Sequence, residues 1–265
     1  MTDRIARLSA ALLLAAPFAA APLPAQAVEY AAGTMKFHVT TATTGSQTTP
    51  GGTSTFEVRL DEKITVNLMK HAKDTVMATM TLDSITLKSP GPAVDLSKLL
   101  GAKVVALVSP TGKFYSAKAP AGLDPQLAQI TDGMGKFMPA FHGNLAKGQA
   151  WTDTVSGKVS QMGLDVDRTT VSSYSVDGDT TIGSEKAFRI QRATSAKGIG
   201  AGNMQGTPVT LEMTGSSVGT FYITPKGTYL GALSKDDVLI KLTVLQQNME
   251  VTIKQAGVTR TEAIK

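Results

Sequence analysis

Period-two alternation of apolar and polar residues runs through most of the chain, and it is the pattern that most limits the possible folds. Apolar side chains occupy every second position in "STFEVRL" (54–60), "KITVNLM" (63–69), "TVMATMTL" (75–82) and "LIKLTVL" (239–245). Because side chains alternate between the two faces of a β-strand, each run predicts a strand with one apolar face. Threonine is frequent at the polar positions, as strands prefer. Many such runs at short spacing predict an antiparallel, mainly β architecture.

Clusters of turn-forming residues separate these runs. They are "TPGGT" (49–53), "DEK" (61–63), "DGD" (177–179) and "TPKG" (224–227). Proline, glycine and aspartate favour turns for distinct conformational reasons, so each cluster predicts a reversal between two strands.

Two segments share one order of residue types: hydroxyl residue, Pro, any residue, Gly, any residue, aromatic. They are "SPTGKF" (109–114) and "TPKGTY" (224–229). Proline presets the φ angle of a type I turn, and glycine then accepts a positive φ at low cost. Each segment therefore predicts a β-hairpin with a three-residue loop and a G1 bulge. Good hairpin turns recur by chance in β-rich proteins, so coincidence and a structural duplication both stay open.

Residues 123–139 depart from the alternation and predict a helix. Asp124 suits the N-cap, Pro125 the first helical position, and Pro139 the end. Glycines at 133 and 135 cost about 1 kcal/mol each relative to alanine, so the helix needs tertiary support. The residues at helical spacing on its apolar stripe are Leu127, Ile130, Met134, Phe137 and Met138. A shorter helical turn is predicted at "DLSKLLG" (95–101).

These elements predict a mainly β fold: a curved antiparallel sheet, half-barrel or barrel-like, with one central helix packed on its apolar face. A single β-rich domain would cover residues 28–265. Its halves, about 28–122 and 140–265, would be joined by the helical segment. Phe141 and Trp151 are expected at the edge of the apolar face.

The first 27 residues have the three parts of a secretory signal peptide. Arg4 and Arg7 precede the apolar stretch "LSAALLLAAPFAAAPL" (8–23), and "AQA" (25–27) forms an A-x-A cleavage site. A retained anchor is the alternative, but the stretch is short and interrupted by proline. The mature chain is therefore expected to begin at Val28, to be periplasmic or extracellular, and to contain no transmembrane span.

The chain contains no cysteine, which excludes thiolate metal sites, cysteine nucleophiles and a lipid anchor at a lipobox. The formal net charge is +5, but lysine and arginine are scattered. Nucleic-acid binding favours a basic stripe, so no nucleic-acid partner is predicted. Weak peripheral contact with anionic envelope lipids stays open.

Three short motifs resemble functional signatures and fail on context. "GSSVG" (215–219) matches G-x-S-x-G with Ser217 as nucleophile, but a strand follows it and every histidine precedes it, so a turn is predicted. "GIGAGNMQG" (198–206) fails the dinucleotide spacing and predicts a mobile loop. "DGDTTIGSE" (177–185) lacks the EF-hand glycine and predicts a hairpin turn. No catalytic residue, metal ligand or cofactor is predicted, and the protein is expected not to be an enzyme.

The A-x-A signal, opening strand, hairpin and Pro-bounded helix are followed by "KGQAWTD" (147–153) and "GSEKAFRI" (183–190). This layout resembles exported β-rich domain families of bacteria. It also looks like the half-barrel lipoprotein carriers of the LolA and LppX type, in which a curved sheet holds an acyl chain under a helical lid. The chain lacks the anchoring cysteine of the lipoprotein members and any diagnostic residue of the carriers, and lipid carriage is what the resemblance implies.

Two functions follow as hypotheses. In the first, an apolar or lipid ligand binds under the helix, lined by Leu127, Ile130, Met134, Phe137, Met138, Phe141 and Trp151. In the second, the protein is a structural or interaction component of the cell envelope with a filled core. Cavity volume beneath the helix separates them, because ligand pockets measure about 300–1,000 Å³.

Overall fold

The computed structural model describes residues 26–90, 94–118, 120–122, 125–135, 137–161, 164–204, 206–247 and 249–264. The predicted signal peptide, apart from Gln26 and Ala27, lies outside the described residues. So does the predicted N-cap, Asp124.

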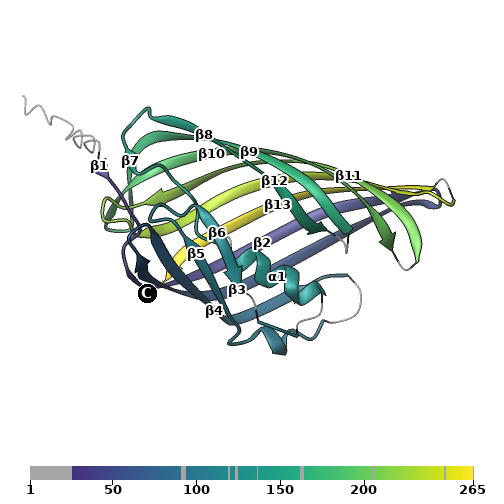
Figure 1. Cartoon of the computed structure of the whole chain (residues 1–265), viewed down its shortest axis with the longest axis horizontal. Coiled ribbons are helices and arrows are strands. Elements are labelled where there is room, and N and C mark those ends of the chain that lie inside the picture. The colour runs from purple at the N-terminus through teal and green to yellow at the C-terminus, as the bar shows by residue number, and fades with distance from the viewer. Residues whose placement is uncertain are drawn as a thin grey trace, which may run out of the picture.

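An antiparallel sheet of eleven strands dominates the molecule (Figure 1). Its spatial order is β6-β5-β4-β3-β2-β13-β12-β11-β10-β9-β8, so β6 and β8 are edges and the sheet is not closed. The chain runs from the central strand β2 outward to β6, and then from the opposite edge β8 back to β13, which pairs with β2. The strands are β2 (Gly33–Thr49), β3 (Gly52–Ala72), β4 (Thr75–Lys88), β5 (Lys103–Val108), β6 (Phe114–Lys118), β8 (Ala150–Gln161), β9 (Leu164–Ile182), β10 (Glu185–Met204), β11 (Thr207–Ile223), β12 (Tyr229–Val244) and β13 (Met249–Ile264). The mainly β, antiparallel prediction is confirmed.

Many strands are longer than predicted, because three expected turns are strand interiors. "DEK" (61–63) lies within β3, and "DGD" (177–179) lies within β9 beside a register shift in the pairing with β10. "GSSVG" (215–219) lies within β11. The neighbouring strands supply hydrogen-bond partners on both sides, which outweighs local turn preference. The reversal predicted at "DGD" occurs instead after Ile182.

The glycine-rich segment predicted as a mobile loop is strand as far as Met204, in the second half of β10. Its glycines at 198, 200 and 202 occupy alternate positions on one face of the sheet. A Cβ at Gly198 would lie 2.8 Å from atoms of Met213 and Val166. The glycines therefore make room for side chains of the adjacent strands.

The helix α1 (Pro125–Gly135) is shorter than the predicted segment. Its contacts are with β5 and β6, near one edge of the sheet, so its position is less central than expected. Phe137 and Met138 follow the helix instead of continuing it. The short turn predicted at 95–101 is the 3-10 helix η1 (Ser97–Leu99). No helix in the described ranges is long and apolar enough to cross a membrane.

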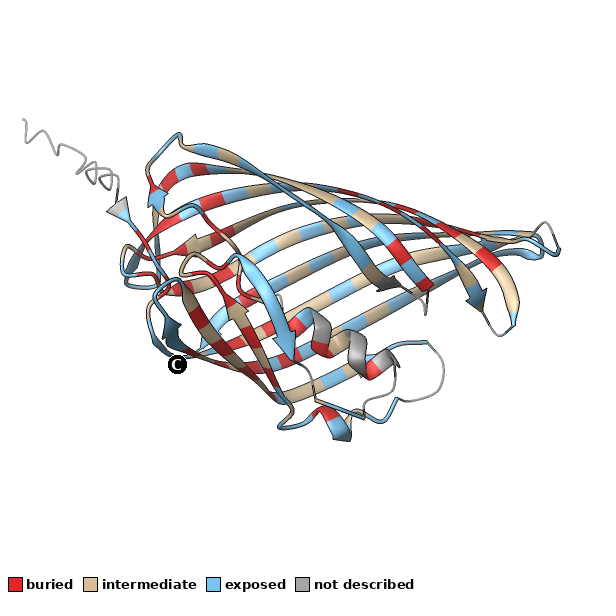
Figure 2. Cartoon of the chain, in the orientation of Figure 1, coloured by how far each residue is buried: buried red, intermediate tan, exposed pale blue. Residues whose placement is uncertain are grey.

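Buried residues gather at one end of the sheet, where α1 and β5 lie (Figure 2). We call this the closed end, and the sheet face that carries Phe37, Phe221 and Tyr229 the inner face. A second, smaller cluster on the same face includes Val166 and Leu211, farther along the strands. Between the two clusters the strands show a mixture of exposed and half-buried residues (Figure 2).

The two matching hairpin turns are confirmed. Gly112 and Gly227 have φ angles of +85° and +80°, and in each turn this glycine N–H donates to the first residue at 2.9 Å. Both turns lie at the closed end, where they hold residues 28–31, which we call the N-terminal strap.

The N-terminal strap is tied to both turns and to the segment after α1. The N–H of Tyr30 donates to Pro110 O at 2.7 Å, and the N–H of Ala31 donates to Gly227 O at 3.1 Å. The N–H of Val28 donates to Gly143 O at 2.6 Å. The preceding pair of residues, β1 (Gln26–Ala27), is bonded to β7 (Asn144–Leu145). The strap therefore closes this end of the sheet.

Candidate ligand site

A cavity of about 210 Å³ lies on the inner face, next to the closed end and beneath Phe137. It belongs to the central strands and is separate from the packing under α1. Six of its lining side chains are apolar and five are polar, and Tyr229 and Gly219 complete the wall. The residues that line it are Val39, Phe137, Pro139, Arg192, Gly219, Thr220, Phe221, Tyr229, Ala232, Leu233, Ser234, Thr259 and Thr261.

Three aromatic rings, those of Phe137, Phe221 and Tyr229, line the closed-end side of this cavity, and Phe37 packs behind two of them. Phe137 contacts Phe37 edge-on, with ring centroids 5.1 Å apart, and Tyr229, with centroids 6.0 Å apart. Phe37 is fully buried, whereas Phe137 is half-buried. Burial raises the pKa of the Tyr229 hydroxyl, so this side chain is neutral at physiological pH. The wall is therefore apolar and uncharged.

The opposite side of the cavity carries a cation, Arg192. Directly paired residues of adjacent strands share a face, and Arg192 pairs with Tyr174 on β9 and with Gly219 on β11. Gly219 has no side chain, and a Cβ there would lie 2.8 Å from Leu233 O and 3.0 Å from Ser234 Cβ on β12. Tyr174 in turn stacks on Trp151, with centroids 4.9 Å apart and planes 6° apart. This stack lies beside Arg192 toward the edge strand β8.

Three buried side-chain atoms in the described part of the chain have no hydrogen-bond partner: Arg192 Nε, Arg168 Nε and Ser217 Oγ. All three residues belong to the inner face. Ser217 lies two positions from Gly219, and Arg168 pairs with Gly198 farther along the sheet. A buried polar atom without a partner costs about 1–3 kcal/mol. The inner face thus contains donors that a polar ligand could satisfy.

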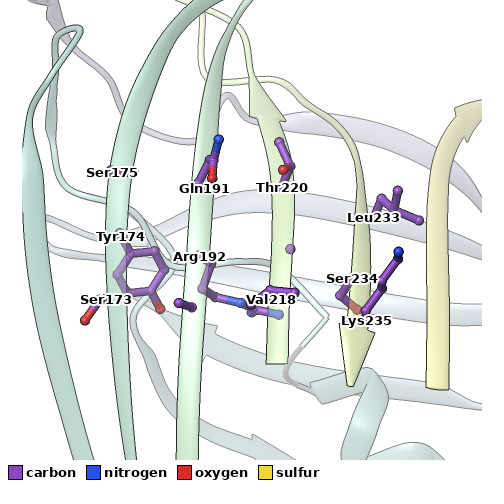
Figure 3. Close-up of a pocket in the computed structure, with 12 residues that line it drawn as sticks. Ser173, Tyr174, Ser175, Gln191, Arg192, Val218, Thr220, Leu233, Ser234 and Lys235 are labelled. Atoms are coloured by element: carbon purple, nitrogen blue, oxygen red, sulfur yellow. The ribbon is translucent and has the colours of Figure 1, made fainter. Parts of the chain in front are cut away.

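A wider hollow of about 490 Å³ crosses the same strands (Figure 3). Figure 3 shows Arg192 extending from β10 toward β11, with Tyr174 on one side and Ser234 on β12 beyond. Most other lining residues belong to the outer face. Gln191 is next to Arg192 on β10, and Thr220 is next to Gly219 on β11, so these two side chains lie on the opposite side of the sheet from Arg192. Only a single sheet layer separates this hollow from the inner cavity, and both include Arg192.

Volume does not single out either site. Three further hollows of about 390, 550 and 600 Å³ lie along the long strands, lined by a mixture of hydroxyl-bearing, charged and apolar side chains. The inner cavity differs from these hollows because it combines a buried aromatic wall with an unpartnered cation.

Glu62 is a buried carboxyl group on the same face, in β3. Its side chain is 7% exposed, and it pairs across the sheet with Val39 and Ile85. Burial, with a smaller contribution from the charge of Asp61, raises the pKa of Glu62 from 4.5 to about 7. The group is thus partly protonated at neutral pH.

The predicted ligand-lining residues all lie in or against the main core. Leu127, Met134, Met138 and Phe141 are buried within it, and Ile130 and Trp151 pack against it. Phe137 alone of the seven lines the inner cavity. The helix therefore packs as core, whereas the segment after it covers the cavity.

Sequence reasoning missed most of the cavity wall. Val39, Phe221 and Arg192 occupy alternate, inward positions on long strands, so the period-two pattern could have found their common face. It could not have found their proximity, because they come from three strands distant in the sequence.

The G-x-S-x-G motif does not form a nucleophile elbow. Ser217 lies inside a strand, not at a strand-to-helix turn, so it lacks the geometry of a nucleophile elbow. Within the described ranges, no group of three or more histidine, aspartate or glutamate side chains is placed to hold a metal ion.

No protein-family model and no curated protein matches the chain. Several solved structures are weakly similar, including these two. One is a domain named as an outer membrane lipoprotein-sorting protein, from Vibrio parahaemolyticus, at 9% identity and a TM-score of 0.15, covering 82% of this chain and 83% of that one. The other is a DUF1329 family protein from Desulfovibrio piger, at 8% identity and a TM-score of 0.14, with the same coverage. These are the kinds of protein that the sequence resembles, and at such TM-scores they bear no weight on function.

Proposed function

We propose that the protein is exported to the bacterial cell envelope and binds an apolar or amphipathic ligand, such as a lipid, on the inner face of its sheet, without catalysing a reaction. The observation that carries the proposal is the inner cavity, where an aromatic wall meets an unpartnered cation on a face that the core leaves uncovered. The signal-peptide pattern of the first 27 residues supports the location.

The size of the cavity limits how such a ligand would bind. At about 210 Å³ it is smaller than the 300–1,000 Å³ of typical ligand pockets. The cavity would therefore hold one part of the ligand, and the remainder would lie on the exposed part of the inner face.

A structural role is the second candidate, and the packing of α1 favours it. Leu127 is 1% exposed and Met134 is 4% exposed, so the helix covers a filled core and not a pocket. In that case the protein would act as an envelope component through its surface, and the inner cavity would hold only solvent.

Native mass spectrometry of the protein purified from its own host separates these two candidates. Ligand binding predicts adducts that organic extraction releases as lipids. Ala232→Leu should lower the amount of adduct, because the longer side chain fills part of the cavity wall. Ala201→Leu, at an exposed position of β10, is the matched control. A wild-type protein free of adducts, together with no binding of added amphiphiles, would leave the structural role.

A further inference from the structure

We infer that Arg192 is the recognition site for an oxyanion, a carboxylate or a phosphate, that forms the head group of an amphipathic ligand. The inference rests on the proposed function, and it narrows the ligand from apolar molecules in general to anionic amphiphiles. It assigns a role to a residue that the core does not require.

The pairing of the arginines distinguishes Arg192. Three arginines of the described chain lie on the outer face, and each pairs with a carboxylate: Arg189 with Asp177 at 2.6 Å, Arg59 with Glu57 at 2.5 Å and Arg260 with Glu262 at 3.3 Å. The two inner-face arginines, Arg168 and Arg192, have no carboxylate within ion-pair distance among the described residues, and the Nε of each is buried without a partner. Arginine is thus neutralised on the outer face and left unpaired on the inner one.

Of these two, only Arg192 lines the cavity. Arg168 lies six residues along β9 from Tyr174, the partner of Arg192, which corresponds to about 20 Å of strand. One anionic group therefore contacts one arginine, and Arg192 is the one beside the apolar wall.

Two carboxylates lie near Arg192 on the inner face, and neither forms an ion pair with it. Asp236 accepts a hydrogen bond from Ser234 at 3.3 Å and pairs with Ser217, one row farther from the closed end. Asp153 pairs with Ser172 on the exposed edge strand. Both lie on the side of Arg192 away from Phe137, so an incoming anion would approach from the cavity side.

The cavity side also offers a neutral donor. Ser234 and Thr259 line it together with Arg192, in one row with Gly219. The Ser234 hydroxyl already donates to Asp236, whereas the Thr259 hydroxyl lies 3.1 Å from that of Thr41 and can accept from it, which leaves the Thr259 proton for a ligand. Hydroxyl groups rotate and can donate to an oxyanion, and a guanidinium can hold two of its oxygens at once. The apolar part of the ligand would lie against Phe137 and Phe221.

The test uses three probes with the same twelve-carbon chain: dodecanoate, dodecyl phosphate and the uncharged dodecanol. Binding to the full mature chain is measured by isothermal titration calorimetry below the concentration at which the probes form micelles. The wild type should bind both anions about tenfold or more tightly than the alcohol, as hydrogen bonds to charged groups allow.

The variants locate the preference. Arg192→Gln should reduce the affinity for both anions to that for dodecanol and leave dodecanol binding unchanged. Arg192→Lys should retain part of the preference, and it serves if the Gln variant unfolds. Arg189→Gln, on the outer face, is the matched control and should behave like the wild type. A preference that disappears in Arg168→Gln instead would overturn the assignment to Arg192.

The remaining outcomes separate the inference from the proposed function. Equal wild-type binding of the anions and dodecanol would overturn the inference and leave apolar binding intact. Inorganic phosphate that competes as well as dodecyl phosphate would identify a free-anion site and overturn the amphiphile. If none of the dodecyl probes binds, the proposed function itself fails.

Discussion

The buried carboxyl group of Glu62 gives the protein a specific dependence of stability on pH. The side chain lies on the inner face between Val39 and Ile85, both apolar, and its pKa rises from 4.5 to about 7. Replacing it by glutamine, which keeps the shape and removes the charge, should abolish this dependence.

The sign and size follow from proton binding. Between pH 4.5 and 7 the unfolded chain releases the proton of Glu62 while the folded chain keeps it, so the free energy of unfolding falls as pH rises. Each unit of pKa difference is worth 1.36 kcal/mol. The wild type should therefore lose about 3 kcal/mol of stability, through this group, between pH 4.5 and pH 8. Below pH 4.5 the contribution is constant.

Urea unfolding, followed by the fluorescence of Trp151 at several pH values from 4.5 to 8, measures the effect. The difference in stability between Glu62→Gln and the wild type should grow by about 3 kcal/mol across this range, in favour of the variant. Glu212→Gln, at an exposed position of β11, is the control and should follow the wild type. Parallel curves for the wild type and Glu62→Gln would refute the reasoning, since Glu62 would then ionise as freely in the folded chain as in the unfolded one.

Three further predictions concern the closed end. Gly227→Ala should destabilise the protein by several kcal/mol more than Gly206→Ala. Both glycines have a φ near +80°, but a Cβ at Gly227 would overlap the backbone of the N-terminal strap, whereas a Cβ at Gly206 would have no atom within 4 Å. Equal thermal midpoints of the two variants would contradict the close contact between Gly227 and the strap. Deleting the strap should lower the midpoint strongly and raise the binding of a hydrophobic dye, since it exposes the core; an unchanged midpoint would contradict this. Met134→Ala should lower the free energy of unfolding by about 2–5 kcal/mol, because it truncates a core side chain. Phe137 is half-buried over the cavity, so Phe137→Ala should lower the free energy of unfolding less and weaken the binding of the dodecyl probes more. If urea unfolding and calorimetry give the reverse order, Phe137 belongs to the core.

The alternation of apolar and polar residues predicted the sheet. It also indicated that β3 continues through residues 61–63, where the turn-forming residues suggested a reversal. Apolar residues at 56, 58, 60, 64, 66 and 68 share one parity, and Glu62 falls between them in the same series. The cluster "DEK" suggested a turn from composition, yet a turn there would have shifted the parity on its far side. The unbroken parity was the better guide, and it placed a carboxyl group on the inner face.

The glycine-rich part of β10 shows the opposite limit. Glycine has no side chain that would indicate which face of a strand it occupies. The alternate glycines at 198, 200 and 202 therefore predict a loop when only the sequence is considered. The cause of this spacing lies in the adjacent strands, where Val166 and Met213 fill the space above the glycines. The same holds for the candidate site. Arg192 on β10 and Phe221 on β11 both line the inner cavity, and only the pairing of these two strands brings them together.

The repeated turn has a physical reason that requires no duplication. The hairpin β5–β6 ends the sheet at an edge, whereas β11 and β12 both lie in its interior, so the two turns occupy unlike positions in the topology. Both nevertheless present backbone carbonyls to the N-terminal strap, and in both a glycine with positive φ faces neighbouring backbone that a side chain would strike. A turn of this type supplies both features at once. Contact with one shared segment is therefore sufficient to favour the same residues twice.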